Sequence, residues 1–179
     1  MAEFLGTLQP VGRNDENDIS SKAEATATDG LGNLRLVRKS SGSPYMSIVR
    51  YYQAGATIRQ GAPLTHHPSL SVDPNVLYEA STSQAGFLAA GIAAANVSNT
   101  LYFSYAYVYG YCPGARVATA LASGITLTIG ATTAGVAYLG EASTASNNPS
   151  LTRMAFAMNQ FANTDIATLS SIIITTMLG

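Results

Sequence analysis

Large, mostly aromatic side chains alternate with mixed, mostly smaller ones with a period of two in residues 101–111. The odd positions hold Leu101, Phe103, Tyr105, Tyr107, Tyr109 and Tyr111, and the even positions hold Tyr102, Ser104, Ala106, Val108 and Gly110. A period of two is typical of a β-strand, because successive side chains point to opposite faces of the sheet. The pattern therefore predicts a strand with one aromatic face and one face of mixed, mostly smaller side chains.

Short β-branched or alternating segments recur along the rest of the chain, each bounded by Gly, Asn, Ser or Pro. We expect strands at 46–53, 75–79, 116–121, 124–129, 135–139, 153–158 and 171–178, and a further short one at 34–37. Many short strands spaced about ten residues apart are typical of a sandwich or a barrel. The sequence therefore predicts an all-β fold, a compact β-sandwich or barrel.

Three passages follow this pattern less directly. Pro63, Pro68 and Pro74 predict a loop-rich passage, because proline excludes a long helix. The segment 86–95 is rich in alanine, which favours a helix, but its two glycines and its place between loop signals favour a strand or a bend. One brief helix, at 161–168, is compatible with the all-β prediction.

Charge is unevenly distributed along the chain. Charged residues make up 11% of the sequence, and Arg116 is the only one between residues 80 and 140. Residues 1–43 carry much of the charge and few large apolar side chains, so they cannot bury enough apolar surface to offset the entropy of ordering. We therefore expect an extended charged N-terminal arm over 1–43, either mobile in solvent or ordered on a partner, and a β-rich domain over 44–179.

The composition argues against several classes of partner. The net charge is −1, so neither nucleic acid nor an anionic membrane is predicted to bind. Every apolar run is shorter than the roughly 20 residues of a membrane-spanning helix, and a single tyrosine-rich strand does not make an outer-membrane barrel. The scarcity of charge favours assembly with other subunits, which hides neutral surface from water.

Candidate catalytic and metal-binding residues are few. His66 and His67 are the only histidines, and no neighbouring Asp, Glu or Cys completes a set of metal ligands around them. The acidic run 14–18 lacks the glycine and glutamate spacing of a calcium-binding EF-hand loop. Cys112, the single cysteine, follows the tyrosine strand in a turn and is expected to be a small half-buried side chain. We predict no enzyme, no cofactor and no metal site.

The tyrosines of the predicted strand admit two roles. Aromatic faces can stack on nucleic-acid bases, but such sites also use a basic groove, and Arg116 is the only cation near this strand. Tyrosine also buries a large area while keeping a hydroxyl for a hydrogen bond. We therefore predict that Tyr105, Tyr107 and Tyr109 pack in the core or between protomers.

Residues 85–179 resemble, in order, the head-decoration (capsid cement) proteins of tailed bacteriophages. The likeness rests on Gly91-Ile92-Ala93, the aromatic strand 105–110, the turn Cys112-Pro113, the small-residue stretch 118–124, the tetrapeptide Thr133-Ala134-Gly135-Val136 and the apolar segment 171–178. Upstream, 52–64 looks like a recurring turn of that group with a Gly-x-Pro step. The long charged N-terminal arm departs from the shortest members of the group.

The resemblance implies a compact β-protein without enzymatic activity. Proteins of this group bind the outer surface of an icosahedral head, commonly as trimers, and brace it against the pressure of the DNA inside. The resemblance therefore implies a location on the outer surface of the virion capsid, with the major capsid protein and further copies of this chain, as a homotrimer, as partners. Arg35, Arg38 and Lys39 of the arm are then the candidate capsid contacts.

Two other functions stay open. The chain can be a tail, baseplate or head-fibre structural protein, which would share this composition and differ only in its location in the virion. It can instead be a carbohydrate-binding β-module, which would need exposed tyrosines and a surface groove.

Overall fold

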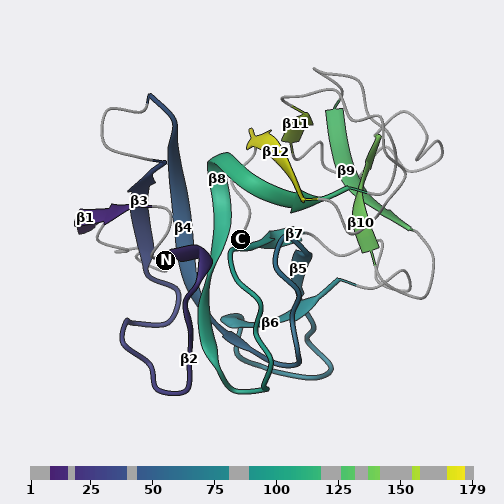
Figure 1. Ribbon diagram of the computed structural model, residues 1–179. Coiled ribbons are helices and arrows are strands. Elements are labelled where there is room, and N and C mark those ends of the chain that lie inside the picture. Colours follow the sequence, from purple (N-terminus) through teal and green to yellow (C-terminus); the bar gives the residue numbers. More distant parts are fainter. Residues whose placement is uncertain are drawn as a thin grey trace, which may run out of the picture.

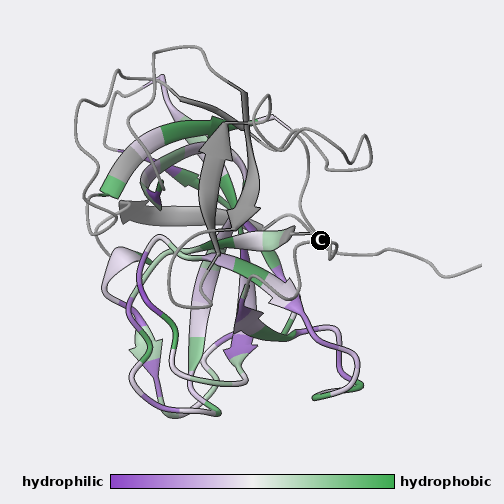
Figure 2. Ribbon diagram, turned by 90° about the vertical axis from the view of Figure 1, so that its right-hand side faces the viewer, coloured by the Kyte–Doolittle hydropathy of each residue, from purple (hydrophilic) through white to green (hydrophobic). Residues whose placement is uncertain are grey.

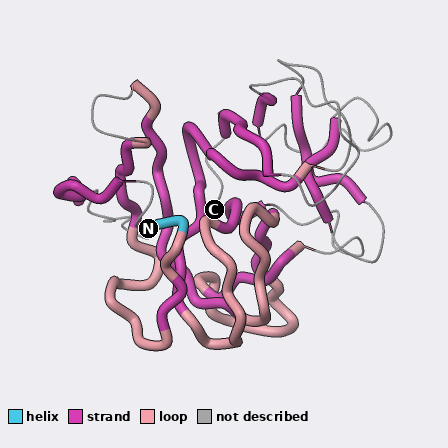
Figure 3. Tube along the Cα trace, viewed as in Figure 1, coloured by secondary structure: helices cyan, strands magenta, loops and turns pink. Residues whose placement is uncertain are grey.

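The computed structural model describes residues 9–15, 19–39, 44–80, 89–117, 126–131, 137–141, 155–157 and 169–175. Strands dominate these ranges, and the only helical residues within them are Ile19 and Ser20 (Figure 3). The strands are β1 (Gln9–Asp15), β2 (Ala23–Glu24), β3 (Leu34–Arg38), β4 (Met46–Ala54), β5 (Pro63–His66), β6 (Val76–Glu79), β7 (Ala89–Ala93), β8 (Phe103–Arg116), β9 (Thr126–Ala131), β10 (Ala137–Glu141), β11 (Ala155–Ala157) and β12 (Leu169–Ile174). The predicted all-β fold is confirmed.

Five of these strands close into a barrel. β4 pairs with β6, β6 with β5, β5 with β7 and β7 with β8, and β8 returns to β4. Every pairing in this ring is antiparallel except the one between β4 and β6, which is parallel. Closing a sheet on itself removes the exposed edges along which chains aggregate. Of the two predicted architectures, the ring is therefore a barrel.

The remaining strands extend the sheet from two members of the ring. β3 and β1 continue it beyond β4, and β12, β11, β9 and β10 continue it from the second half of β8 (Figure 1). β8 bends near Gly110, which has a φ of 81° and would bring a side chain against the carbonyl oxygen of Met46. Only glycine adopts this conformation without strain. Gly110 thus allows one strand to serve both the barrel and its extension.

The core lies on both sides of β4. Tyr51 and Tyr52 are adjacent in the sequence and point to opposite faces, yet both are fully buried. Tyr51 packs in a cluster with Tyr105, Tyr107 and neighbouring aliphatic side chains, whereas Tyr52 belongs to a second cluster with residues such as Leu64. At this point of β4, apolar packing therefore covers both faces of the sheet.

No helix in the described residues is long and apolar enough to cross a membrane. Figure 2 shows hydrophilic and hydrophobic residues interleaved along the described strands and loops. This interleaving is the pattern expected of strands whose two faces meet different surroundings.

Most of the predicted strands coincide with observed ones. The predictions at 34–37, 46–53, 75–79, 86–95, 124–129, 135–139, 153–158 and 171–178 overlap β3, β4, β6, β7, β9, β10, β11 and β12. The tyrosine strand is longer than predicted, because β8 runs on to Arg116. β5 was not predicted; it begins at Pro63, and proline is tolerated as the first residue of a strand. The helix predicted at 161–168 and residues 118–121 lie outside the described residues.

Residues 19–39 differ from the predicted extended arm, because they pack against the barrel. Ile19 and Val37 are 2% and 1% exposed and belong to the core. β3 pairs with β4 along its whole length, and β2 pairs with the start of β8. Two apolar side chains of the segment reach the core, and four of its charged residues form two ion pairs, so a low average hydrophobicity did not prevent docking. The core thus includes residues on both sides of position 44.

Candidate interaction surface

The three tyrosines that were predicted to pack in the core or between protomers differ in their burial. Tyr105 and Tyr107 are buried at 2% exposure each, whereas Tyr109 is 44% exposed. The Tyr105 ring packs against Tyr51 of β4, with 4.9 Å between the ring centroids. Core packing thus describes Tyr105 and Tyr107. For Tyr109, contact with another molecule stays a prediction.

A β-bulge explains why Tyr109 leaves the core. Val49 of β4 pairs with Tyr107, but the preceding Ile48 pairs with Tyr109, so that Val108 has no opposite residue in β4. One extra residue in a strand exchanges the faces of the side chains beyond it. Tyr109 therefore shares a face of the sheet with Ile48 and not with Val49, although it continues the alternation of Tyr105 and Tyr107.

Tyr109 belongs to an exposed surface that we call the tyrosine–lysine patch, formed by Arg38, Lys39, Tyr45, Met46 and Tyr109. Arg38 on β3 is the partner of Met46 on β4, and the backbone N–H of Lys39 donates to the carbonyl oxygen of Tyr45 at 3.2 Å. Tyr45 and Met46 are 40% and 39% exposed. The β3–β4 connection and the middle of β8 thus bring together residues far apart in the sequence.

Two side chains of the patch are held in place by contacts beneath them. The Tyr45 ring stacks on Tyr111, with 5.1 Å between centroids and 27° between planes. The Lys39 ammonium lies 4.6 Å from the centroid of the Tyr111 ring and 5.8 Å from that of Tyr45. Tyr111 is 4% exposed, and its hydroxyl lies 3.3 Å from Ser171 Oγ on β12. Because these contacts order the side chains in advance, less entropy is lost when a partner binds.

Four of the five side chains of the patch are of types enriched at protein interfaces, whereas lysine is depleted there. Tyrosine, methionine and arginine are enriched at interfaces between proteins, and tyrosine and arginine are prominent among the residues that carry most of the binding energy. Within the described part of the chain, no group of three or more His, Cys, Asp or Glu residues could hold a metal ion.

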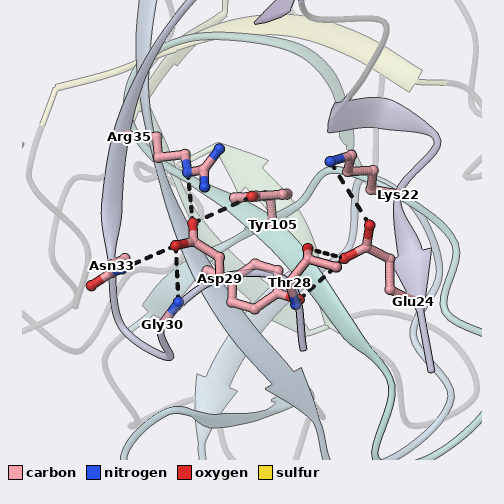
Figure 4. A network of polar contacts seen from close by, with 9 residues as sticks. Lys22, Glu24, Thr28, Asp29, Gly30, Asn33, Arg35 and Tyr105 are labelled. Atoms are coloured by element: carbon pink, nitrogen blue, oxygen red, sulfur yellow. Dashed lines mark hydrogen bonds and ion pairs between the residues drawn. The ribbon is translucent and has the colours of Figure 1, made fainter. Parts of the chain in front are cut away.

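Of the three predicted capsid contacts, Arg38 and Lys39 lie in the patch and Arg35 does not. Arg35 lies on the face of β3 opposite to Arg38, because side chains alternate along a strand. Its Nε lies 2.6 Å from Asp29 Oδ2, and its guanidinium lies 5.7 Å from the centroid of the Tyr105 ring (Figure 4). Arg35 is thus engaged within the chain and is poorly placed for an outward contact.

The ion pair of Arg35 is part of a polar network that the sequence did not reveal (Figure 4). Asp29 accepts hydrogen bonds from the Gly30 amide at 2.9 Å, from Asn33 Nδ2 at 3.0 Å and from the Tyr105 hydroxyl at 3.4 Å. Burial alone would raise the pKa of Asp29, but the hydrogen bonds from Arg35, Asn33 and Gly30 lower it below the usual value. Asp29 is therefore held as a carboxylate. Burial also raises the pKa of Tyr105, to about 12.

A second carboxylate completes the network. Glu24 accepts hydrogen bonds from the Tyr51 hydroxyl at 3.2 Å and from Thr28 Oγ1 at 2.5 Å, and its other oxygen lies 3.8 Å from Lys22 Nζ. The Tyr51 hydroxyl in turn accepts a hydrogen bond from the Thr28 amide at 3.1 Å. Each of the two carboxylates is thus bonded to a tyrosine of the core.

The histidines and the cysteine occupy structural positions. His66 ends β5, with its Nε2 3.0 Å from the carbonyl oxygen of Ser71, and His67 Nδ1 lies 2.7 Å from Ser69 Oγ. Both belong to the polar connection between β5 and β6. Cys112 is fully buried in β8.

Neither the models of known protein families nor the curated proteins searched match this chain.

Proposed function

We propose that this chain is a structural virion protein that binds the outside of an icosahedral phage capsid and stabilises it. The observation that carries the proposal is the tyrosine–lysine patch, a group of exposed aromatic and basic residues around the β3–β4 connection and the middle of β8. Several segments that resemble decoration proteins also lie side by side, because β7, β8 and β12 are neighbours in the sheet. The major capsid protein is the proposed partner of the patch.

The proposal includes self-association as a homotrimer on the outer capsid surface. Only 11% of the residues are charged, and so neutral a surface favours contact between copies. Weak contacts repeated over a shell stabilise it by mass action. No catalytic step is part of this function.

The experiment is a binding assay with undecorated phage heads. The purified chain should bind heads saturably and raise their resistance to heat. The double substitution Tyr109→Ala with Met46→Ala should weaken binding about 30-fold, because central aromatic anchors contribute about 2 kcal/mol or more.

The matched control for the binding assay is Val72→Ser. Val72 is 96% exposed in the β5–β6 connection, which adjoins the other end of β4 through a hydrogen bond from the Gln53 amide to Asn75. The control should bind heads like the wild type. The proposal would be contradicted if the chain did not bind heads, or if the control lost as much binding as the double substitution. Binding to purified tails would assign the chain to the tail instead.

A carbohydrate-binding module is the second candidate, because Tyr45 and Tyr109 present exposed rings. Aromatic faces of this kind can stack on sugar rings. Saturable quenching of tyrosine fluorescence by a polysaccharide, without any binding to heads, would favour this function.

A further inference from the structure

Residues 22–35, which we call the strap, lie across the barrel and are attached to it mainly by polar contacts (Figure 4). Every residue of the strap is exposed or half-buried. The fully buried residues Ile19 and Val37 lie just outside it, one before and one after. The strap is therefore a polar segment between two apolar anchors.

The strap covers a pair of core tyrosines through its two carboxylates. Asp29 accepts the hydrogen bond of the Tyr105 hydroxyl, and Glu24 accepts that of Tyr51. The two rings are 4.9 Å apart, and neither is more than 2% exposed. A neutral acid cannot accept these bonds and pair with a cation as a carboxylate does, so the attachment depends on the charge of Asp29 and Glu24.

We propose that residues 22–33 of the strap are an acid-releasable latch, which opens as a unit when Asp29 is neutralised and uncovers Tyr51 and Tyr105 while the barrel stays closed. The five strands of the ring include neither β2 nor β3. β3 is separately held by its ladder to β4 from Leu34 to Arg38. Opening of residues 22–33 thus breaks none of the pairings that close the barrel.

The charged and titratable groups that face the two carboxylates come from each element packed against the strap. They are Lys22 beside β2, Arg35 of β3, Tyr51 of β4 and Tyr105 of β8. The pKa of Asp29 is lowered in the folded chain. Its contribution is therefore complete above the unfolded pKa of about 3.9 and is lost as the pH falls through the folded value. Arg35 keeps its charge there and loses its partner.

Hydrogen exchange of the full chain tests the latch. The amides of Thr28 and Gly32 report on the strap, because both donate to Tyr51, the first to its hydroxyl and the second to its carbonyl oxygen at 2.8 Å. At pH 7, Asp29→Asn should exchange these amides at least tenfold faster than the wild type, with β7 and β8 unchanged. The wild type should approach the same pattern as the pH falls below about 3.9, after correction for intrinsic rates.

The matched control is Glu79→Gln, because Glu79 also pairs with an arginine, Arg59, at 2.5 Å, but does so away from the strap. It should speed exchange of the Arg59 amide and leave the strap as in the wild type. If Asp29→Asn does not fold, hydrogen exchange of Glu24→Gln and the pH dependence of exchange in the wild type still test the latch. The latch proposal would be overturned if the strap amides exchanged only together with those of the barrel, or if neither Asp29→Asn nor Glu24→Gln changed their exchange rates.

Discussion

At the scale of single residues, Tyr51 and Tyr52 differ in the hydrogen bonding of their hydroxyls, although both rings are fully buried. The Tyr51 hydroxyl donates to Glu24 and accepts from the Thr28 amide. Burial raises the pKa of Tyr52 far above its usual value, although the Ser104 hydroxyl lowers it. No hydrogen bond of good geometry reaches the Tyr52 hydroxyl within the described residues. The hydroxyl is thus well hydrogen-bonded in Tyr51 and poorly hydrogen-bonded in Tyr52.

This difference predicts opposite effects on stability when the hydroxyl of Tyr51 or that of Tyr52 is removed by substitution with phenylalanine. Tyr51→Phe should lower the free energy of unfolding by about 1–2 kcal/mol, because it removes one hydrogen bond to Glu24 and the acceptor of the Thr28 amide. Tyr52→Phe should change it by less than about 0.5 kcal/mol or increase it, because no good hydrogen bond is lost. Urea unfolding measures both. Equal losses in the two variants would show that the Tyr52 hydroxyl has a strong partner.

At the scale of elements, the sequence predicted where strands lie better than which way their side chains face. The alternation in 101–111 correctly indicated a strand, but it also implied a single aromatic face. The bulge at Val108 and the left-handed Gly110 divide that face, and both depend on how β8 meets β4. Contact between strands far apart in the sequence leaves no local pattern, so Tyr109 could not be assigned to the surface in advance.

The strap and the patch escaped sequence analysis for the same reason. A count of charges treats Asp29 and Arg35 as solvated groups, whereas the fold pairs them above a tyrosine. Arg38 and Lys39 were identified as candidate contacts from their charge. The three apolar members of the patch could be found only once β3, β4 and β8 were seen side by side.

The bend of β8 yields a prediction at the same scale. Gly110→Ala should lower the free energy of unfolding by more than about 1 kcal/mol, because its φ is 81° and the new methyl group meets the backbone of Met46. Gly114→Ala in the same strand is the control. There the nearest atom to the new methyl is Leu169 Cδ1 at 3.3 Å, the end of a flexible side chain. If thermal melting shows equal losses, the bend at Gly110 is not a conformational requirement.

At the scale of the whole molecule, the barrel supplies stability from apolar packing and the strap adds a part that depends on pH. Folding buries Tyr105 as a neutral phenol and Asp29 as a carboxylate. The two groups limit the stability of the fold at opposite ends of the pH range. The Tyr105 phenol ionises in alkali, and the Asp29 carboxylate is protonated in acid. The folded chain should therefore be most stable on a broad plateau between them.

The alkaline edge of this plateau is the sharper test, because the pKa of Tyr105 is raised to about 12, mainly by burial. A raised pKa contributes stability that is complete below the unfolded value of about 10 and is lost as the pH rises through about 12. The urea midpoint of the wild type should fall across that window. Tyr105→Phe, which has no phenol to ionise, should start lower and fall less steeply. Tyr109→Phe, at an exposed position, should follow the wild type throughout. A Tyr105→Phe curve parallel to that of the wild type would mean that the alkaline loss comes from other buried tyrosines, among them Tyr52, whose pKa burial also raises.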